Sequence, residues 1–267
     1  MTQFNSATLR KRVLQMAYAG ATVHVGCAFS IIEICAVLYR NHLHFPDGDP
    51  NAPGRDYFVL SKGHGVMAQY ACLNELGWIS DSDLARYFGD GTRLKGLSDT
   101  HVPGCEATSG SLGHGLPIGV GLALAAKLRG TAQHCYVVAG DGEMNEGTMW
   151  EALLFASHRK LDNLMLIIDE NGFQAMGRTS EVLDLGNLAA KLTSFGFETR
   201  EVDGHNEGAL DEAVRQLRST ANGQPKAIVA RTVKGKGVSF MENENAWHYT
   251  RLSPETFQRA MIELEEQ

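Results

Sequence analysis

The sequence predicts an α/β protein with a doubly wound, mainly parallel sheet and helices on both faces. Short apolar runs alternate with longer segments whose apolar residues recur at helical spacing. The runs are apolar at consecutive positions, as in strands that βαβ crossovers bury on both sides. No repeat or flexible linker interrupts the alternation, so we expect a single domain over residues 1–267. The expected strands are Tyr57–Leu60, Cys135–Ala139, Leu164–Ile168 and Ala227–Ala230.

Helix start signals place helices before, between and after these strands. Ser6 is expected to cap a first helix that ends at Gly20, and Ser30–Glu33 has the pattern of a capping box that opens a second helix. Ser253–Pro254, a cap followed by proline, predicts the start of the last helix. The other expected helices are Met67–Leu76, Leu116–Leu128, Gly147–His158, Leu188–Phe195 and Leu210–Leu217.

The bulk composition excludes several classes of function. A net charge of −7 with scattered basic residues offers no surface for nucleic acid or an acidic membrane. Leu116–Leu128 is too short to span a bilayer and is interpreted as a buried helix, and the first residues lack a secretory signal pattern. The five cysteines form no C-x-x-C pair, which favours reduced thiols over a disulfide framework or a zinc site. We therefore expect a cytoplasmic protein.

Small, polar and ionisable residues follow each predicted strand. The segments are Ser61–Gly65, Gly140–Gly142, Asp169–Gly172 and Lys234–Gly237. In open parallel sheets, ligands bind beyond the carboxyl ends of the strands. The sequence therefore predicts that these four segments form one binding site.

Asp141 and Asn171 are candidate ligands of a divalent cation. An Asp between two glycines is common turn chemistry, but glycine also lets the backbone approach a phosphate. If the two strands are neighbours, a carboxylate and an amide oxygen meet, which suits Mg²⁺ bound to a phosphate ester. Lys62 is expected to face that anion, and Lys234 and Lys236 either lie in a solvated turn or face it as well.

These features together resemble enzymes that use thiamine diphosphate. Gly140-Asp141-Gly142 through Asn171 is similar to the thiamine-diphosphate motif, which opens with Gly-Asp-Gly and closes with asparagine. The resemblance implies that Asp141, Asn171 and the backbone carbonyl of Phe173 bind Mg²⁺ (or Ca²⁺). It also implies that the amide of Gly142 faces the diphosphate.

Other segments resemble transketolases in particular, in the family's order along nearly the whole chain. They are Thr22–Gly26, Ser61–His64, Pro103–Gly115 and Trp247–His248. The resemblance implies catalytic roles for His24 and His248. The cofactor contacts that it implies are His64, Gly110, Leu112, Gly142, Glu146, Asn171, Lys234 and His248, with Glu146 near a second subunit.

The resemblance covers only one part of a transketolase. The family continues into a pyrimidine-binding domain and a carboxyl-terminal domain, so it implies a partner subunit that carries both, in an α2β2 assembly. With that partner the protein would move a two-carbon ketol unit from a ketose, such as a sugar phosphate, to an aldose. The alternatives are the α subunit of a 2-oxo-acid dehydrogenase and a non-catalytic cofactor-binding subunit.

The sequence departs from the family pattern at several positions. Leu97 stands where the family commonly has histidine, and the nearby His101 is a candidate replacement. His114 occupies the usual place of a glutamine, and Val25 that of a proline. A catalytic role and an ordinary loop histidine are equal alternatives for His101 and His114. These departures bear on substrate preference.

Overall fold

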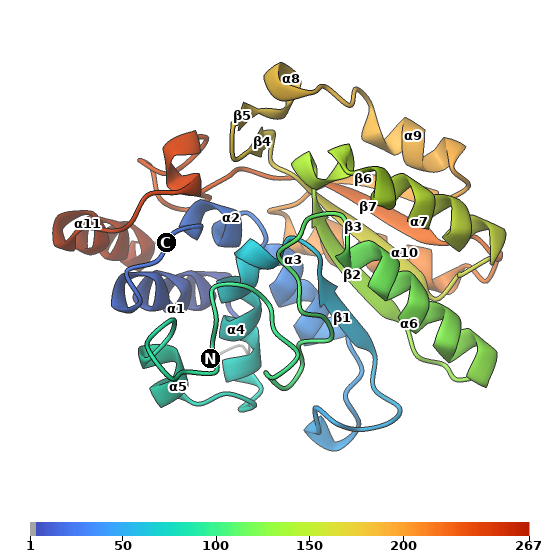
Figure 1. Ribbon diagram of the computed structural model, residues 1–267, viewed down its shortest axis with the longest axis horizontal. Coiled ribbons are helices and arrows are strands. Elements are labelled where there is room, and N and C mark those ends of the chain that lie inside the picture. The colour runs from blue at the N-terminus through green and yellow to red at the C-terminus, as the bar shows by residue number, and fades with distance from the viewer. Residues whose placement is uncertain (1–3, 267) are drawn as a thin grey trace.

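The computed structural model describes residues 4–266, and its centre is a five-stranded parallel sheet in the order β1-β2-β3-β7-β6 (Figure 1). Its strands are β1 (Tyr57–Leu60), β2 (Cys135–Gly140), β3 (Leu164–Glu170), β6 (Glu198–Asp203) and β7 (Lys226–Arg231). β2 pairs with β3 in a register that sets Gly140 opposite Asp169. Since the strands are parallel, their carboxyl ends lie at one edge of the sheet. The doubly wound α/β fold is as predicted.

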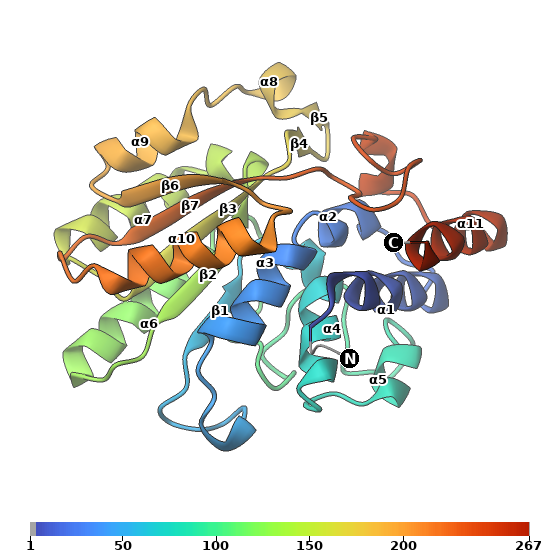
Figure 2. The same cartoon turned by 180° about the vertical axis from the view of Figure 1, so that it is seen from behind.

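Both faces of the sheet are buried, because alternate side chains of each strand enter different cores. On β2 and β3, Val137 and Leu166 pack on one face and Val138 and Ile167 on the other. In Figure 1, helices α6 and α7 lie in front of the sheet. In Figure 2, which shows the opposite side, α3 and α10 lie in front of it. The first face is covered by α6 (Gly115–Arg129), α7 (Gly147–His158) and α9 (Leu188–Ser194).

The second face carries the larger core. It is built with α1 (Ser6–Ala19), α2 (Val25–Phe29), α3 (Ile32–Val37), α4 (Val66–Glu75), α10 (Glu207–Ser219) and α11 (Pro254–Glu265). A wider π turn, Leu38–His42, continues α3. The short elements α5 (Asp81–Ala85), β4 (Phe173–Gln174), β5 (Gly177–Arg178) and α8 (Thr179–Val182) lie in the connections. Among residues 4–266, no helix is long and apolar enough to cross a membrane.

Two predicted helix caps are wrong. Asn5, not Ser6, caps α1: its side chain accepts the N–H of Thr8, while the Ser6 hydroxyl donates to Glu207. Ser30 does not open a capping box, because its hydroxyl donates to Asp169 at 2.7 Å. Tertiary partners outcompete the local bond in both places. The second predicted helix corresponds to α3, which begins at Ile32, whereas α2 lies before Ser30 and was not predicted.

Two further expectations need correction. β6 is absent from the predicted strands because its residues are mostly polar, which an edge strand tolerates since it pairs only with β7. The segment Leu116–Leu128 is helical, but it is buried on one side only. Ile118 is 38% exposed and Leu128 is 71% exposed.

Candidate functional site

A cavity of about 630 Å³ opens at the carboxyl ends of β1, β2 and β3. Its walls come from segments far apart in the sequence, since His24 and His248 both line it. Among the described residues, it is lined by most of the predicted site: His24, His64, Gly110, Leu112, Asp141, Gly142, Glu146, Asn171, Phe173 and His248. The structure thus brings together residues that three of the strand ends and three outlying segments predicted separately.

Three imidazoles meet on one side of the cavity. The ring centroid of His24 lies 5.3 Å from that of His64 and 5.3 Å from that of His248. The centroids of His64 and His248 are 5.4 Å apart. Burial, followed by Lys234, lowers the pKa of His24 to about 4 and of His248 to about 3. Burial and Lys62 lower the pKa of His64 well below its usual value. All three rings are therefore neutral near pH 7 and available for proton transfer.

The backbone of His24 is held in an unusual conformation. Its φ of 71° is left-handed, which costs a non-glycine residue about 1–2 kcal/mol. Its N–H donates to the carbonyl of His248 at 3.2 Å, and its own carbonyl accepts the N–H of Cys27 at 3.1 Å. These bonds fix the start of α2 against the turn that carries His248.

Two buried lysines lie beneath the imidazoles. The ammonium of Lys62 contacts the carboxylate of Asp169, which outweighs burial and holds the Lys62 pKa above and the Asp169 pKa below their ordinary values. Lys234 does not line the cavity; its Nζ lies 2.7 Å from His248 Nδ1. Burial lowers the pKa of Lys234. Two ammonium groups therefore lie at or near the cavity, and positive charge in that place suits an anion.

The predicted metal ligands lie at the ends of the neighbouring strands β2 and β3. Asp141 is buried and accepts the N–H of Gly142 at 2.8 Å and of Gly172 at 2.7 Å. Burial, followed by the nearby Asp169, raises the pKa of Asp141 to about 7. Among the described residues, no cation forms a salt bridge with this carboxylate at close range. A buried, unneutralised carboxylate beside the amide of Asn171 fits a divalent cation.

Close packing constrains the predicted Gly142 more firmly than Gly110, whose close neighbour is the end of the exposed Leu97 side chain. A Cβ on Gly142 would lie 2.7 Å from the Cβ of Gln174, and one on Gly110 would lie 2.6 Å from Leu97. In this structure the N–H of Gly142 donates to Asp141. The backbone of the Gly-Asp-Gly turn is thus pressed against β4, which allows no side chain at position 142.

Of the remaining predicted positions, two line the cavity and two lie outside it. Glu146 is exposed at the cavity rim, where it precedes α7, and Leu97 lines the cavity and is 41% exposed. His101 and His114 are exposed and do not line the cavity. His101 Nδ1 lies 2.6 Å from Asp99 Oδ1, and of the two positions it is Leu97 that lines the cavity.

Several cavity residues were not among the predicted site residues. Cys27 lies beside His248, and Asn145 and Gln174 carry buried polar atoms without a hydrogen-bond partner in the described chain. Unsatisfied buried polar atoms are costly, so Gln174 Nε2 and Asn145 Oδ1 fit a site made for a polar ligand. The polar residues after the Gly-Asp-Gly turn and after Asn171 were a signal for these two positions; Cys27 offered none.

The fold and this cavity define an α/β domain with a polar site at the carboxyl edge of its sheet, and comparison with known proteins identifies its family. Residues 5–264 match the family described as the thiamine diphosphate binding domain of transketolase. The chain is 38% identical to one subunit of the apulose-4-phosphate transketolase of Actinobacillus succinogenes, over 98% of this chain and 94% of the relative. It is also 38% identical to a 6-deoxy-6-sulfo-D-fructose transketolase subunit of Clostridium, over 99% of this chain and 96% of the relative.

Solved structures show the same fold. Transketolase from Leishmania mexicana superposes with a TM-score of 0.89 at 30% identity, over 97% of this chain and 40% of that one. Transketolase from Campylobacter jejuni gives the same TM-score at 27% identity, over 99% of this chain and 43% of that one. The chain belongs to the transketolase family, as the N-terminal subunit of a split, two-subunit transferase. It spans less than half of the length of these solved transketolases.

Proposed function

We propose that this subunit, together with a second one, transfers a two-carbon ketol unit from a ketose to an aldose with thiamine diphosphate and Mg²⁺. The observation that carries the proposal is the convergence of three neutral imidazoles, Lys62 and an unneutralised Asp141 on one cavity, with Lys234 in contact with His248. When bound, the cofactor supplies a thiazolium carbanion that adds to the ketose carbonyl and holds the two-carbon unit.

The cation and the diphosphate would share the carboxyl end of the sheet. Asp141, Asn171 and the carbonyl of Phe173 are the proposed protein ligands of Mg²⁺, since it prefers oxygen ligands and bridges phosphates. Lys62 already pairs with Asp169, so Lys234 is the ammonium more available to neutralise the diphosphate. The further proposed contacts are His64, Gly110, Leu112, Gly142, Glu146 and His248.

His24 and His248 are the proposed proton carriers. Both rings line the cavity, and their lowered pKa values keep them neutral, so either can accept a proton from a ketose hydroxyl near pH 7. Their edge-to-face contact, with an interplanar angle of 82°, keeps the rings at a fixed mutual orientation. The proton then returns to the alkoxide that develops on the acceptor aldose when the new ketose forms.

The proposed substrate is a ketose that carries a phosphate or another acidic group. The named substrates of the two relatives are a sugar phosphate and a sulfonated sugar, which share an anionic end. Residues that bind this end are assigned to the partner, which we expect to supply the pyrimidine-binding and carboxyl-terminal domains in an α2β2 assembly. A single domain over residues 1–267 and a cytoplasmic location complete the proposal.

The deciding experiment is a ketol-transfer assay of this chain, by itself and mixed with candidate partner subunits, with thiamine diphosphate and Mg²⁺. We expect transfer only in a mixture, and we expect His24→Ala to reduce kcat by about 10²–10⁴ with little change in cofactor affinity. Oxidative decarboxylation of a 2-oxo acid in place of transfer would contradict the proposal. Unchanged turnover of the His24→Ala mixture would leave a subunit that binds cofactor without a catalytic histidine.

A further inference from the structure

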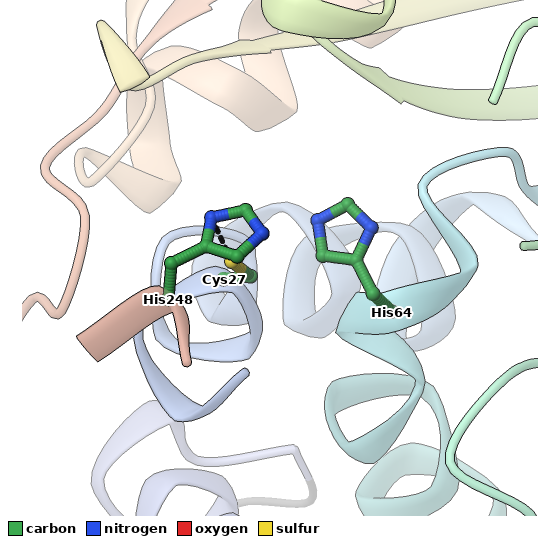
Figure 3. A group of neighbouring side chains, drawn as sticks. All are labelled: Cys27, His64 and His248. Atoms are coloured by element: carbon green, nitrogen blue, oxygen red, sulfur yellow. Dashed lines mark hydrogen bonds between the residues drawn. The ribbon is translucent and has the colours of Figure 1, made fainter. Parts of the chain in front are cut away.

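A thiol and two imidazoles meet at the base of the cavity. Cys27 comes from α2, His64 from the turn before α4 and His248 from the turn before α11 (Figure 3). Cys27 Sγ lies 3.5 Å from His248 Nδ1, the contact drawn as a dashed line in Figure 3. One ligand atom of each residue lies within 4.8 Å of the other two. Sulfur and imidazole nitrogen together are a donor set for borderline-soft metals.

We propose that Cys27, His64 and His248 bind one Zn²⁺ ion in the subunit that lacks its cofactor. With Zn–S of about 2.3 Å and Zn–N of about 2.0 Å, tetrahedral S and N ligands are about 3.5 Å apart. Cys27 and His248 already have this separation. All the ligand atoms lie within 4.8 Å of one another, so the widest separation exceeds this value by at most about 1.3 Å, which a movement of the His64 side chain has to close on metal binding. Water from the cavity takes the fourth position.

The surroundings both favour and oppose this ion. Cys27 is only 2% exposed yet lines the cavity, so a metal reaches it through the opening that admits the cofactor. Lys234 opposes the ion, because its Nζ lies 2.7 Å from the same His248 Nδ1. Zn²⁺ must displace this ammonium group. The metal therefore binds more tightly when position 234 carries no charge.

Zinc and the cofactor cannot occupy the site together. This second part rests on the proposed function, in which His64, His248 and Lys234 face the diphosphate. A zinc ion that holds both imidazoles takes those contacts away, so the zinc-loaded subunit is closed to thiamine diphosphate until the ion leaves. The thiol of Cys27 thereby makes cofactor loading sensitive to zinc.

The test is a titration of the metal-free full chain with Co²⁺, whose absorption reports thiolate ligation and tetrahedral geometry. We expect one Co²⁺ per chain, a thiolate charge-transfer band and displacement by Zn²⁺. Cys27→Ser should remove the band, whereas Cys35→Ser, a buried thiol outside the cavity, should keep it. Lys234→Met should tighten Co²⁺ binding about tenfold. No band in the wild type, or the same band in Cys27→Ser, overturns the metal site.

Two further measurements guard the interpretation. His64→Gln and His248→Gln should each weaken Co²⁺ binding while circular dichroism stays that of the wild type; full retention by both variants overturns the ligand set. Thiamine diphosphate with Mg²⁺, bound to the metal-free chain by calorimetry, should erase the cobalt bands. If it binds and the bands persist, mutual exclusion is overturned. If thiamine diphosphate binds neither the chain by itself nor the chain with its partner, the proposed function is wrong, whereas the cobalt spectrum continues to support the metal site.

Discussion

The imidazole of His205 connects the buried carboxylate of Glu33 to the loop that carries Lys234. His205 Nδ1 lies 2.9 Å from Glu33 Oε2, and its Nε2 accepts the backbone N–H of Val233 at 2.8 Å. Because Nε2 accepts, the ring proton resides on Nδ1 and is donated to Glu33. Arg10 pairs with Glu33 as well and donates from Nε to the carbonyl of Lys236 at 2.8 Å. Glu33 thus anchors the loop on both sides of Lys234.

Glu33→Gln should destabilise the protein by about 3–5 kcal/mol, because it leaves the Arg10 guanidinium buried without its counter-charge. Urea unfolding measures the loss. Glu212→Gln, which removes a surface pair with Arg215, is the matched control and should change the free energy of unfolding by less than about 1 kcal/mol. Equal free energies of unfolding for the two variants would show that the contacts of Glu33 do not stabilise the protein.

Removing the imidazole of His205 should act on the Lys234 loop more than on the fold. In His205→Ala the N–H of Val233 loses its acceptor, and we expect cofactor affinity to fall about 3- to 10-fold, a binding difference of roughly 1 kcal/mol. Calorimetry with thiamine diphosphate and the partner subunit measures it. His205→Gln, which retains an acceptor, should recover part of the affinity. If His205→Ala loses no affinity, or if His205→Gln recovers none, this hydrogen bond does not position the loop.

Asp141→Asn should stabilise the metal-free protein at pH 8 while abolishing its stabilisation by Mg²⁺ with cofactor. Its pKa of about 7 exceeds the ordinary 3.8, so the unfolded state loses this proton first and stability is lost as the pH rises through 7. The gain should amount to a few kcal/mol at most, at about 1.4 kcal/mol per pKa unit. Thermal unfolding in a chelator at pH 5 and pH 8 should show wild type and variant converging at the lower pH.

His24 should make the protein less stable in acid. Its pKa of about 4 is below the ordinary 6.5, so the neutral ring's contribution is complete above pH 6.5 and is lost as the pH falls toward 4. Because the ring is partly exposed, solvent screens part of this effect, and we expect the free energy of unfolding to fall by roughly 1 kcal/mol. Unfolding of wild type and His24→Asn between pH 7 and pH 4.5 measures the difference. Parallel curves for the two proteins would contradict a buried neutral imidazole.

Gly142→Ala should disrupt the site locally. The new methyl group would lie 2.7 Å from the Cβ of Gln174, so β4 must move away from the Gly-Asp-Gly turn. We expect cofactor affinity with Mg²⁺ to drop at least tenfold, together with a stability loss of about 1–3 kcal/mol. Gly147→Ala, at the start of α7, is the control, because a Cβ there meets no atom within 4 Å. Similar affinities of the two variants would show that the turn tolerates a side chain.

The sequence by itself determined four of the five strands of the sheet and the location of the site. The apolar strands β1, β2, β3 and β7 were predicted because a strand buried on both faces needs consecutive apolar residues. Parallel strands end at one edge, so the polar residues after them had to converge there, and Asp141 and Asn171 do. These properties follow from local pattern and chain direction alone.

Only the tertiary structure decided how the polar side chains pair. Ser30, expected to cap a helix, donates to Asp169, 139 residues away, and Asn5 caps α1 instead of Ser6. β6 is held by its single neighbour β7 despite its polar residues. The contact of Cys27 with His248 spans 221 residues. Such bonds depend on the positions that packing of the core imposes on segments distant in sequence, and no local pattern encodes those positions.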